Sequence, residues 1–140
     1  MYIDEVMTHN TQVVSSGSSV KEVANTMAQN QAGMIPVYED DKLIGTVTDR
    51  DLVVGAIAKN MGVDDKILKV ISEPVLYCFK DDLAIDVLEN MNRNKVQRLV
   101  VLDNEHNKQL AGIVSVGDIA SQCDDEHIAR SIVECSRHYH

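Results

Sequence analysis

A phrase that occurs twice is the feature that most restricts the fold of this chain. GTVTDRDL begins at Gly45 and GIVSVGDI begins at Gly112. Both read glycine, two residues, threonine or serine, two residues, aspartate and then a large aliphatic side chain. Two copies of such a phrase in 140 residues indicate a duplicated supersecondary unit.

The repetition extends well beyond the phrase itself. Residues 20–39 align with residues 84–103 at an offset of 64, which pairs Val23 with Val87 and Met27 with Met91. The offset then grows to 67, because the loop DNEHNKQ is three residues longer than EDDK. A polar surface loop is where a duplicated fold tolerates a change of length.

Hydrophobic periodicity predicts the same order of elements in each repeat: strand, helix, strand, strand, helix. The helical stripes begin at Val20 and Ala84, and second helices begin near Asp49 and Gly117. The predicted strands are residues 11–14, 34–38 and 43–47 in the first repeat, and 76–79, 98–102 and 110–114 in the second. The segments around residues 7 and 71 are expected to enter each repeat from the opposite side.

These elements predict an α/β (α+β) fold in which two βαββα repeats form one pseudo-twofold module. The first repeat with its connector takes residues 1–66, the second takes 67–122, and a C-terminal extension takes 123–140. With no tryptophan and one phenylalanine, the core must be aliphatic. We expect the glycines of the repeated phrase to let strand and helix approach closely.

Charge and composition exclude several classes of function. The net charge is -9, from 13 basic and 22 acidic residues, which disfavours nucleic acid and anionic membrane surfaces as partners. No stretch approaches the roughly 18 apolar residues of a membrane span, and the N-terminus lacks the apolar segment of a signal peptide. Three cysteines without disulfide spacing favour free thiols, so we expect a cytoplasmic protein.

The hydroxyl and the acid of the repeated phrase support two interpretations. Thr48 with Asp51, and Ser115 with Asp118, have the spacing of a capping box, in which both side chains satisfy backbone groups at a helix start. The same atoms suit a ligand, because a helix start attracts anions and a carboxylate accepts hydrogen bonds from ribose hydroxyls. The spacing alone leaves both interpretations open.

The chain resembles a pair of CBS (cystathionine β-synthase) domains, often called a Bateman module, over residues 6–122. The resemblance rests on MIPVYEDDKLIGTVTDRDL and QRLVVLDNEHNKQLAGIVSVGDI, each preceded by a helix. It implies a non-enzymatic sensor that binds an adenosine-type nucleotide such as AMP, ADP or ATP in clefts between the repeats. It also implies a disc-like homodimer, which fits an aliphatic helix face of Leu52, Val53, Ala56 and Ile57, and a separate effector protein that receives the signal.

The resemblance assigns roles by position. Asp51 and Asp118 would bind ribose, Thr48 and Ser115 would contact ribose or phosphate, and Arg98 would contact phosphate. The first repeat has Met34 where the second has Arg98, so Arg50 is the candidate to compensate there. Adenine would lie among apolar positions that include Thr11, Val13, Ile35, Pro36, Val37, Leu99 and Val100. Related modules take S-adenosylmethionine, NAD, cyclic dinucleotides or divalent cations, and these ligands stay open.

The C-terminal extension offers an alternative function. Cys123, His127, Cys135 and His138 stand at helical spacings that could hold zinc or respond to redox state. A helical extension used in packing or dimerisation is the interpretation we favour. A third alternative is a scaffold without a ligand. The chain contains no nucleophile-elbow or P-loop motif, so we expect no catalytic residues.

Overall fold

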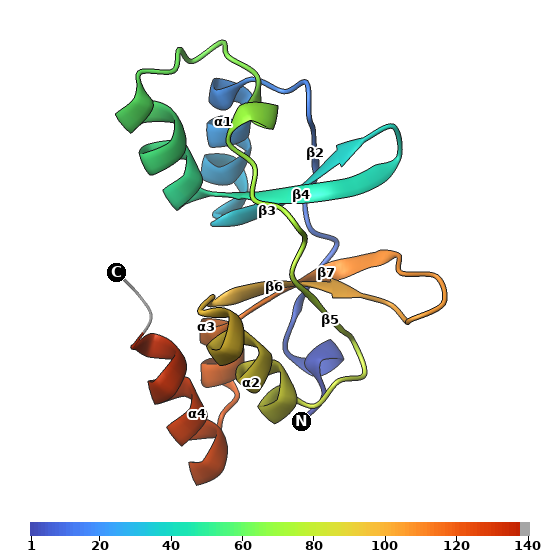
Figure 1. The fold of residues 1–140 in the computed structure, drawn as a ribbon. Coiled ribbons are helices and arrows are strands. Elements are labelled where there is room, and N and C mark those ends of the chain that lie inside the picture. Colours follow the sequence, from blue (N-terminus) through green and yellow to red (C-terminus); the bar gives the residue numbers. More distant parts are fainter. Residues whose placement is uncertain (138–140) are drawn as a thin grey trace. The chain divides into compact units, whose positions relative to one another are not determined.

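The computed structural model describes residues 1–137 and divides the chain into two compact units (Figure 1). One unit is Gln12–Val75. The other combines Met1–Thr11 with the chain from Leu76 onward. No helix within the described residues is long and apolar enough to cross a membrane.

The unit Gln12–Val75 is a three-stranded sheet with helices against it. Strand β2 (Val14–Ser15) is parallel to β3 (Met34–Glu39), which is antiparallel to β4 (Lys42–Thr48). Helix α1 (Val20–Asn30) begins where the Ser19 hydroxyl accepts the Glu22 N–H at 3.1 Å. The helical segments η2 (Asp51–Ala56), η3 (Ile57–Lys59) and η4 (Ile67–Lys69) follow. Its core is aliphatic and includes Val23, Ile35, Val37, Val47 and Ile67.

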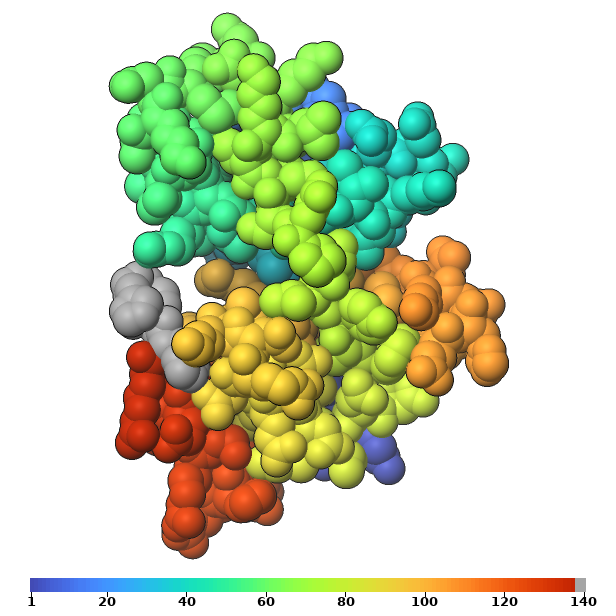
Figure 2. Space-filling model, in the orientation of Figure 1, coloured from blue at the N-terminus to red at the C-terminus, as the bar shows by residue number. Residues whose placement is uncertain are grey.

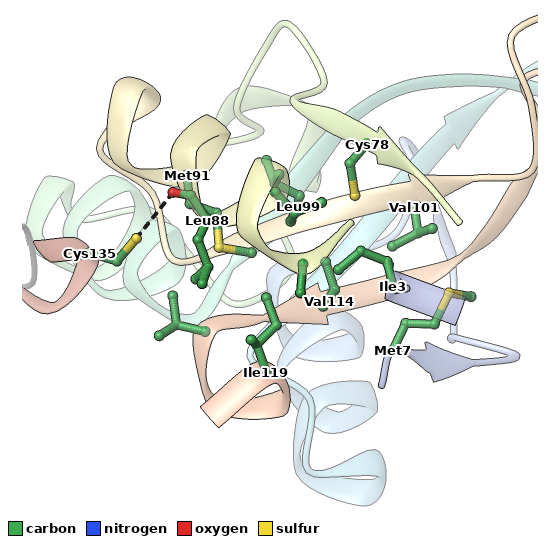
Figure 3. Close-up of a cluster of buried hydrophobic side chains, with 13 residues drawn as sticks. Ile3, Met7, Cys78, Leu88, Met91, Leu99, Val101, Val114, Ile119 and Cys135 are labelled. Atoms are coloured by element: carbon green, nitrogen blue, oxygen red, sulfur yellow. Dashed lines mark hydrogen bonds between the residues drawn. The ribbon is translucent and has the colours of Figure 1, made fainter. Parts of the chain in front are cut away.

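The second unit is a four-stranded sheet in the order β1-β7-β6-β5. Its strands are β1 (Thr8–His9), β5 (Tyr77–Phe79), β6 (Arg98–Leu102) and β7 (Leu110–Ser115). Its helices are the short η1 (Ile3–Glu5), α2 (Ala84–Asn94), α3 (Val116–Ser121) and α4 (Glu126–Ser136). Figure 3 shows its core, in which Ile3 and Met7 of the N-terminal segment join Leu99, Val114 and Ile119.

The predicted order of elements is confirmed in both units. The main difference is the first strand, which was expected over residues 11–14 and begins only at Val14. The chain leaves β1 through Asn10, whose φ of 52° is left-handed, and residues 11–13 belong to no strand. Residues 11–13, most of the predicted strand, are therefore an irregular connection between β1 and β2.

The glycines of the repeated phrase lie where another segment of the chain crosses the strand. In β7, Gly112 pairs with His9 of β1, and in β4 the neighbour of Gly45, Thr46, exchanges two backbone hydrogen bonds with Ser72, at 2.8 and 3.1 Å. A Cβ on Gly45 would stand 2.7 Å from the Ser72 carbonyl oxygen, and one on Gly112 would overlap that of Thr8. The expected approach of strand to helix was therefore wrong. Both glycines make room for a neighbouring backbone.

At each crossing, a segment of one repeat pairs with a strand of the other. Thr8 of the first repeat pairs with Ile113 of the second. Ser72 of the second repeat pairs with Thr46 of the first. The two bridges are equivalent under the sequence alignment, so the duplication includes the exchange of segments.

Helix α4 is part of the core of its unit. Asp125 caps its start by accepting the His127 N–H at 2.7 Å. Near its end Cys135 is fully buried, and its thiol donates to the Leu88 carbonyl oxygen of α2 at 3.3 Å (Figure 3). In the space-filling view the red surface of α4 lies against the yellow surface of α2 (Figure 2). These contacts agree with an extension used in packing.

Candidate functional site

The repeated phrase forms the same hydrogen-bonded helix start in both units. In the first repeat the Thr48 N–H donates to Asp51 Oδ2 at 2.9 Å, and the Asp51 N–H donates to Thr48 Oγ1 at 3.0 Å. In the second repeat Ser115 and Asp118 make the same two bonds at the same distances. The capping-box interpretation is therefore confirmed in both copies.

The capping role leaves part of each carboxylate for other contacts. The backbone bond uses Oδ2, and each carboxylate oxygen has two lone pairs. Asp51 and Asp118 are both half-buried, so their side chains are held in place yet still reach solvent. An oriented carboxylate whose second oxygen is not used by the helix cap can accept hydrogen bonds from hydroxyl or ammonium donors, and charge-assisted bonds of this kind are the stronger ones.

The two carboxylates differ in one contact. The Ser72 hydroxyl donates to Asp51, at 3.2 Å from Oδ2 and 3.4 Å from Oδ1. No side chain of the described residues makes a corresponding bond to Asp118, and the residue aligned with Ser72 is Thr8. Sequence reasoning missed Ser72, although residues 6–8 (VMT) also align with residues 70–72 (VIS) at the offset of 64, which contained the signal.

Arg98 lies beside the second helix start. It is the first residue of β6 and pairs across the sheet with Ser115, the last residue of β7. Its side chain is exposed. In the first repeat the matching pair is Met34 with Thr48, and Met34 is buried. Arg50 is exposed and lies directly before Asp51. The structure thus places a cation beside the hydroxyl in the second repeat and an apolar side chain there in the first.

The apolar residues expected around adenine divide between two faces of the sheets. Ile35, Val37 and Leu99 are fully buried inside the hydrophobic cores of their units. Alternation along a strand sends Pro36 and Val100 to the opposite faces, where both are also buried. The remaining two positions lie between β1 and β2: Thr11 is half-buried and Val13 is exposed.

One face of the second sheet therefore combines an exposed charged side chain, a half-buried hydroxyl and buried apolar side chains. Arg98 and Val100 are two residues apart on β6, and their partners on β7 are Ser115 and Ile113. All four belong to the face opposite the core residues Leu99, Val101 and Val114.

The cysteine and histidine candidates of the extension lie in different surroundings. The Cys135 thiol is buried, and burial with the nearby Glu134 carboxylate raises its pKa. Cys123 is half-buried, and its thiol donates to the Asp125 carbonyl oxygen at 3.4 Å. His127 is exposed in the first turn of α4, and His138 lies outside the described residues. No cluster of three or more metal-ligating side chains occurs among residues 1–137.

Comparison with known proteins adds a family. The family model described as CBS domain matches residues 3–55 and 65–125. YlbB of Bacillus subtilis is 34% identical over 120 residues, which are 84% of this chain and 79% of that protein. YhcV of the same organism, described as a CBS domain-containing protein, is 27% identical over 96% of this chain and 94% of its own length. An uncharacterized protein of Methanocaldococcus jannaschii is 32% identical, and this chain spans 34% of its length.

Solved structures share the fold at lower identity. A conserved CBS domain protein of Thermoplasma acidophilum has a TM-score of 0.83 and 22% identity, over 98% of this chain and 76% of that one. A CBS domain protein of Pyrobaculum aerophilum complexed with AMP has a TM-score of 0.76 and 21% identity, over 95% and 98%. A CBS domain pair from protein MJ0100, in complex with 5′-methylthioadenosine and S-adenosyl-L-methionine, has a TM-score of 0.77 and 20% identity, over 87% and 94%.

Proposed function

Because this chain belongs to the CBS domain family, we propose that it is a non-enzymatic regulatory module whose ligand contains adenosine. The observation that carries the proposal is the pair of oriented carboxylates, Asp51 and Asp118, each with an oxygen that the helix cap does not use. Two structural neighbours support the ligand class, since one is complexed with AMP and the other with 5′-methylthioadenosine and S-adenosyl-L-methionine.

The second repeat is the stronger of the two candidate sites. Asp118 accepts the ribose hydroxyls, Ser115 contacts ribose or phosphate, and Arg98 contacts phosphate. Val100 lies two residues along the same face from Arg98 and is the apolar residue we assign to the base, although its side chain is fully buried in the structure. In the first repeat Asp51 and Thr48 take the same roles without an arginine at Met34, and with Ser72 already bonded to the carboxylate.

Calorimetry with AMP tests the role of the carboxylates. Asp118→Asn keeps a side-chain oxygen for the helix cap and removes the charge. A loss of affinity for AMP in this variant would therefore indicate a lost ligand contact, since the cap can still form. If Asp118 binds the ribose, 2′-deoxy-AMP loses a charge-assisted hydrogen bond and binds about tenfold to hundredfold more weakly than AMP. Asp51→Asn is the matched variant for the first repeat. Equal affinities for AMP and 2′-deoxy-AMP would refute the ribose contact.

The proposal includes self-association and a separate effector protein. Of the four aliphatic residues expected on one helix face, Leu52 and Ala56 are buried in the core, whereas Val53 and Ile57 are 56% and 66% exposed. The exposed pair is the surface we assign to a second copy of the chain. Light scattering at micromolar concentration should show a dimer that Ile57→Asp converts to a monomer. A wild-type monomer would contradict this assignment.

A further inference from the structure

In both repeats, one backbone hydrogen bond joins the residue before the second strand of the repeat (β3 or β6) to the start of the helical segment that follows the third strand. In the first repeat the Asp49 N–H donates to the Gly33 carbonyl oxygen at 3.1 Å. In the second repeat the Val116 N–H donates to the Gln97 carbonyl oxygen at 2.9 Å. The alignment matches Gly33 with Gln97, so only the second repeat has a side chain at this junction.

The side chain of Gln97 reaches the end of α4. Its Nε2 donates to the carbonyl oxygen of Cys135 at 3.2 Å, in a half-buried position. Cys135 is itself held by its thiol on the Leu88 carbonyl oxygen of α2. Ile128 and Ile132 of α4 also contact the core, so the helix is docked along its length and tied at its last turn.

Gln97 therefore connects α4 with the candidate site, because its side-chain Nε2 bonds to α4 and its backbone carbonyl oxygen bonds to the start of α3. Its carbonyl oxygen holds Val116, which directly follows Ser115, and its peptide continues into Arg98. We therefore expect a movement of Gln97 on undocking of α4 to displace the hydroxyl of Ser115 and the cation of Arg98.

We propose that Gln97 is a positioning residue that couples docking of α4 to ligand binding at Arg98, Ser115 and Asp118. The proposal rests on the proposed function for the identity of the ligand, with AMP as the test compound. Coupling of this kind is reciprocal: a docked α4 raises the affinity for AMP, and AMP stabilises the docked helix by the same factor.

The first experiment needs no ligand. Gln97→Met keeps the length of the side chain and removes the N–H donor. Residue-resolved amide exchange by NMR should show exchange about fivefold faster in the last turn of α4 and at Val116, as expected for the loss of one neutral hydrogen bond. Gln109→Met is the matched control, because Gln109 Nε2 donates only to the Asn107 carbonyl oxygen of its own loop, at 3.4 Å. Unchanged exchange at Val116 in Gln97→Met would overturn the coupling.

The second experiment adds AMP. In the wild type and in Gln109→Met, AMP should slow exchange in the last turn of α4. In Gln97→Met this protection should disappear and the affinity for AMP should fall several-fold. If Gln97 were merely structural, Gln97→Met would speed exchange in α4, but AMP would still slow that exchange. This result would overturn the proposal. If the wild type binds no AMP, the proposed function fails for this ligand, and the coupling is decided by the first experiment alone.

Discussion

Gly112→Ala is expected to be among the most damaging of the small substitutions in this chain. The added methyl group would overlap the Thr8 carbonyl oxygen and stand 2.9 Å from the Met7 Cε. A flexible methionine tip can move, but a paired backbone cannot move without separating β1 from β7. Since Gly112 does not have a positive φ, the penalty is steric and carries no contribution from backbone conformation.

The magnitude follows from what the separation of β1 removes. Overpacking against a fixed neighbour costs about 1–3 kcal/mol. Loss of pairing at Thr8 and His9 removes backbone hydrogen bonds that each contribute about 1 kcal/mol. Met7 is only 7% exposed, and its partial release loses some of the roughly 1.5–3 kcal/mol of a buried methionine. We therefore expect the free energy of unfolding to fall by about 3–5 kcal/mol.

Urea denaturation followed by circular dichroism measures this loss, and Gly117→Ala is the matched control. A Cβ at Gly117 meets only Ser115 Oγ, at 3.6 Å, and the position lies within α3. Alanine there should be neutral or stabilise the protein by up to about 1 kcal/mol, because glycine is the weaker helix former. If Gly112→Ala unfolds at the same urea concentration as Gly117→Ala, β1 does not cross this strand as described.

Three further outcomes are expected. Leu88→Ala should lower the free energy of unfolding by about 2–5 kcal/mol in urea titrations, because the side chain is fully buried. Burial, with a smaller effect from Asp82, raises the pKa of Cys78 from 9.0 to about 12. The unfolded thiol therefore ionises first, and stability should fall between about pH 9 and 12, by up to about 1.4 kcal/mol per pH unit relative to Cys78→Ala. With a thiol reagent, Cys123 should react quickly while the buried Cys78 and Cys135 react only on unfolding, and rapid reaction of all three thiols would contradict the described core.

Much of the fold could be predicted from the repeat and its periodicity. Strand β6 was predicted with its observed bounds, because Arg98–Leu102 is an apolar run between a helix and a polar loop. The start of β2 was missed, because an apolar pair such as Val13 and Val14 does not reveal the left-handed turn at Asn10 that precedes it. Sequence patterns predict local backbone geometry better than they predict pairing between strands that are distant in the sequence.

The candidate site depends even more on contacts that local sequence patterns do not predict. The spacing of Thr48 and Asp51 could not distinguish a capping box from a ligand contact, since both use the same atoms. Ser72 lies 21 residues beyond Asp51 and reaches it only because the connecting segment pairs with β4. The contact of Gln97 with Cys135 spans 38 residues and depends on the docking of α4. Neither contact follows from a motif, since each depends on two elements being packed together.

Two consecutive residues at the start of the second strand distinguish the candidate sites of the two repeats. The framework is shared: both copies keep the crossing glycine, the capped helix start and the backbone bond into it. At the start of the second strand the first repeat has Gly33 and Met34, and the second has Gln97 and Arg98. Through these two consecutive changes, Arg98 places a cation beside Ser115, and the Gln97 side chain donates a hydrogen bond to α4. Under the proposed function, a ligand and a helix would meet at these adjacent residues. The second repeat would then have both parts that a sensor requires, a site and an element that responds to it.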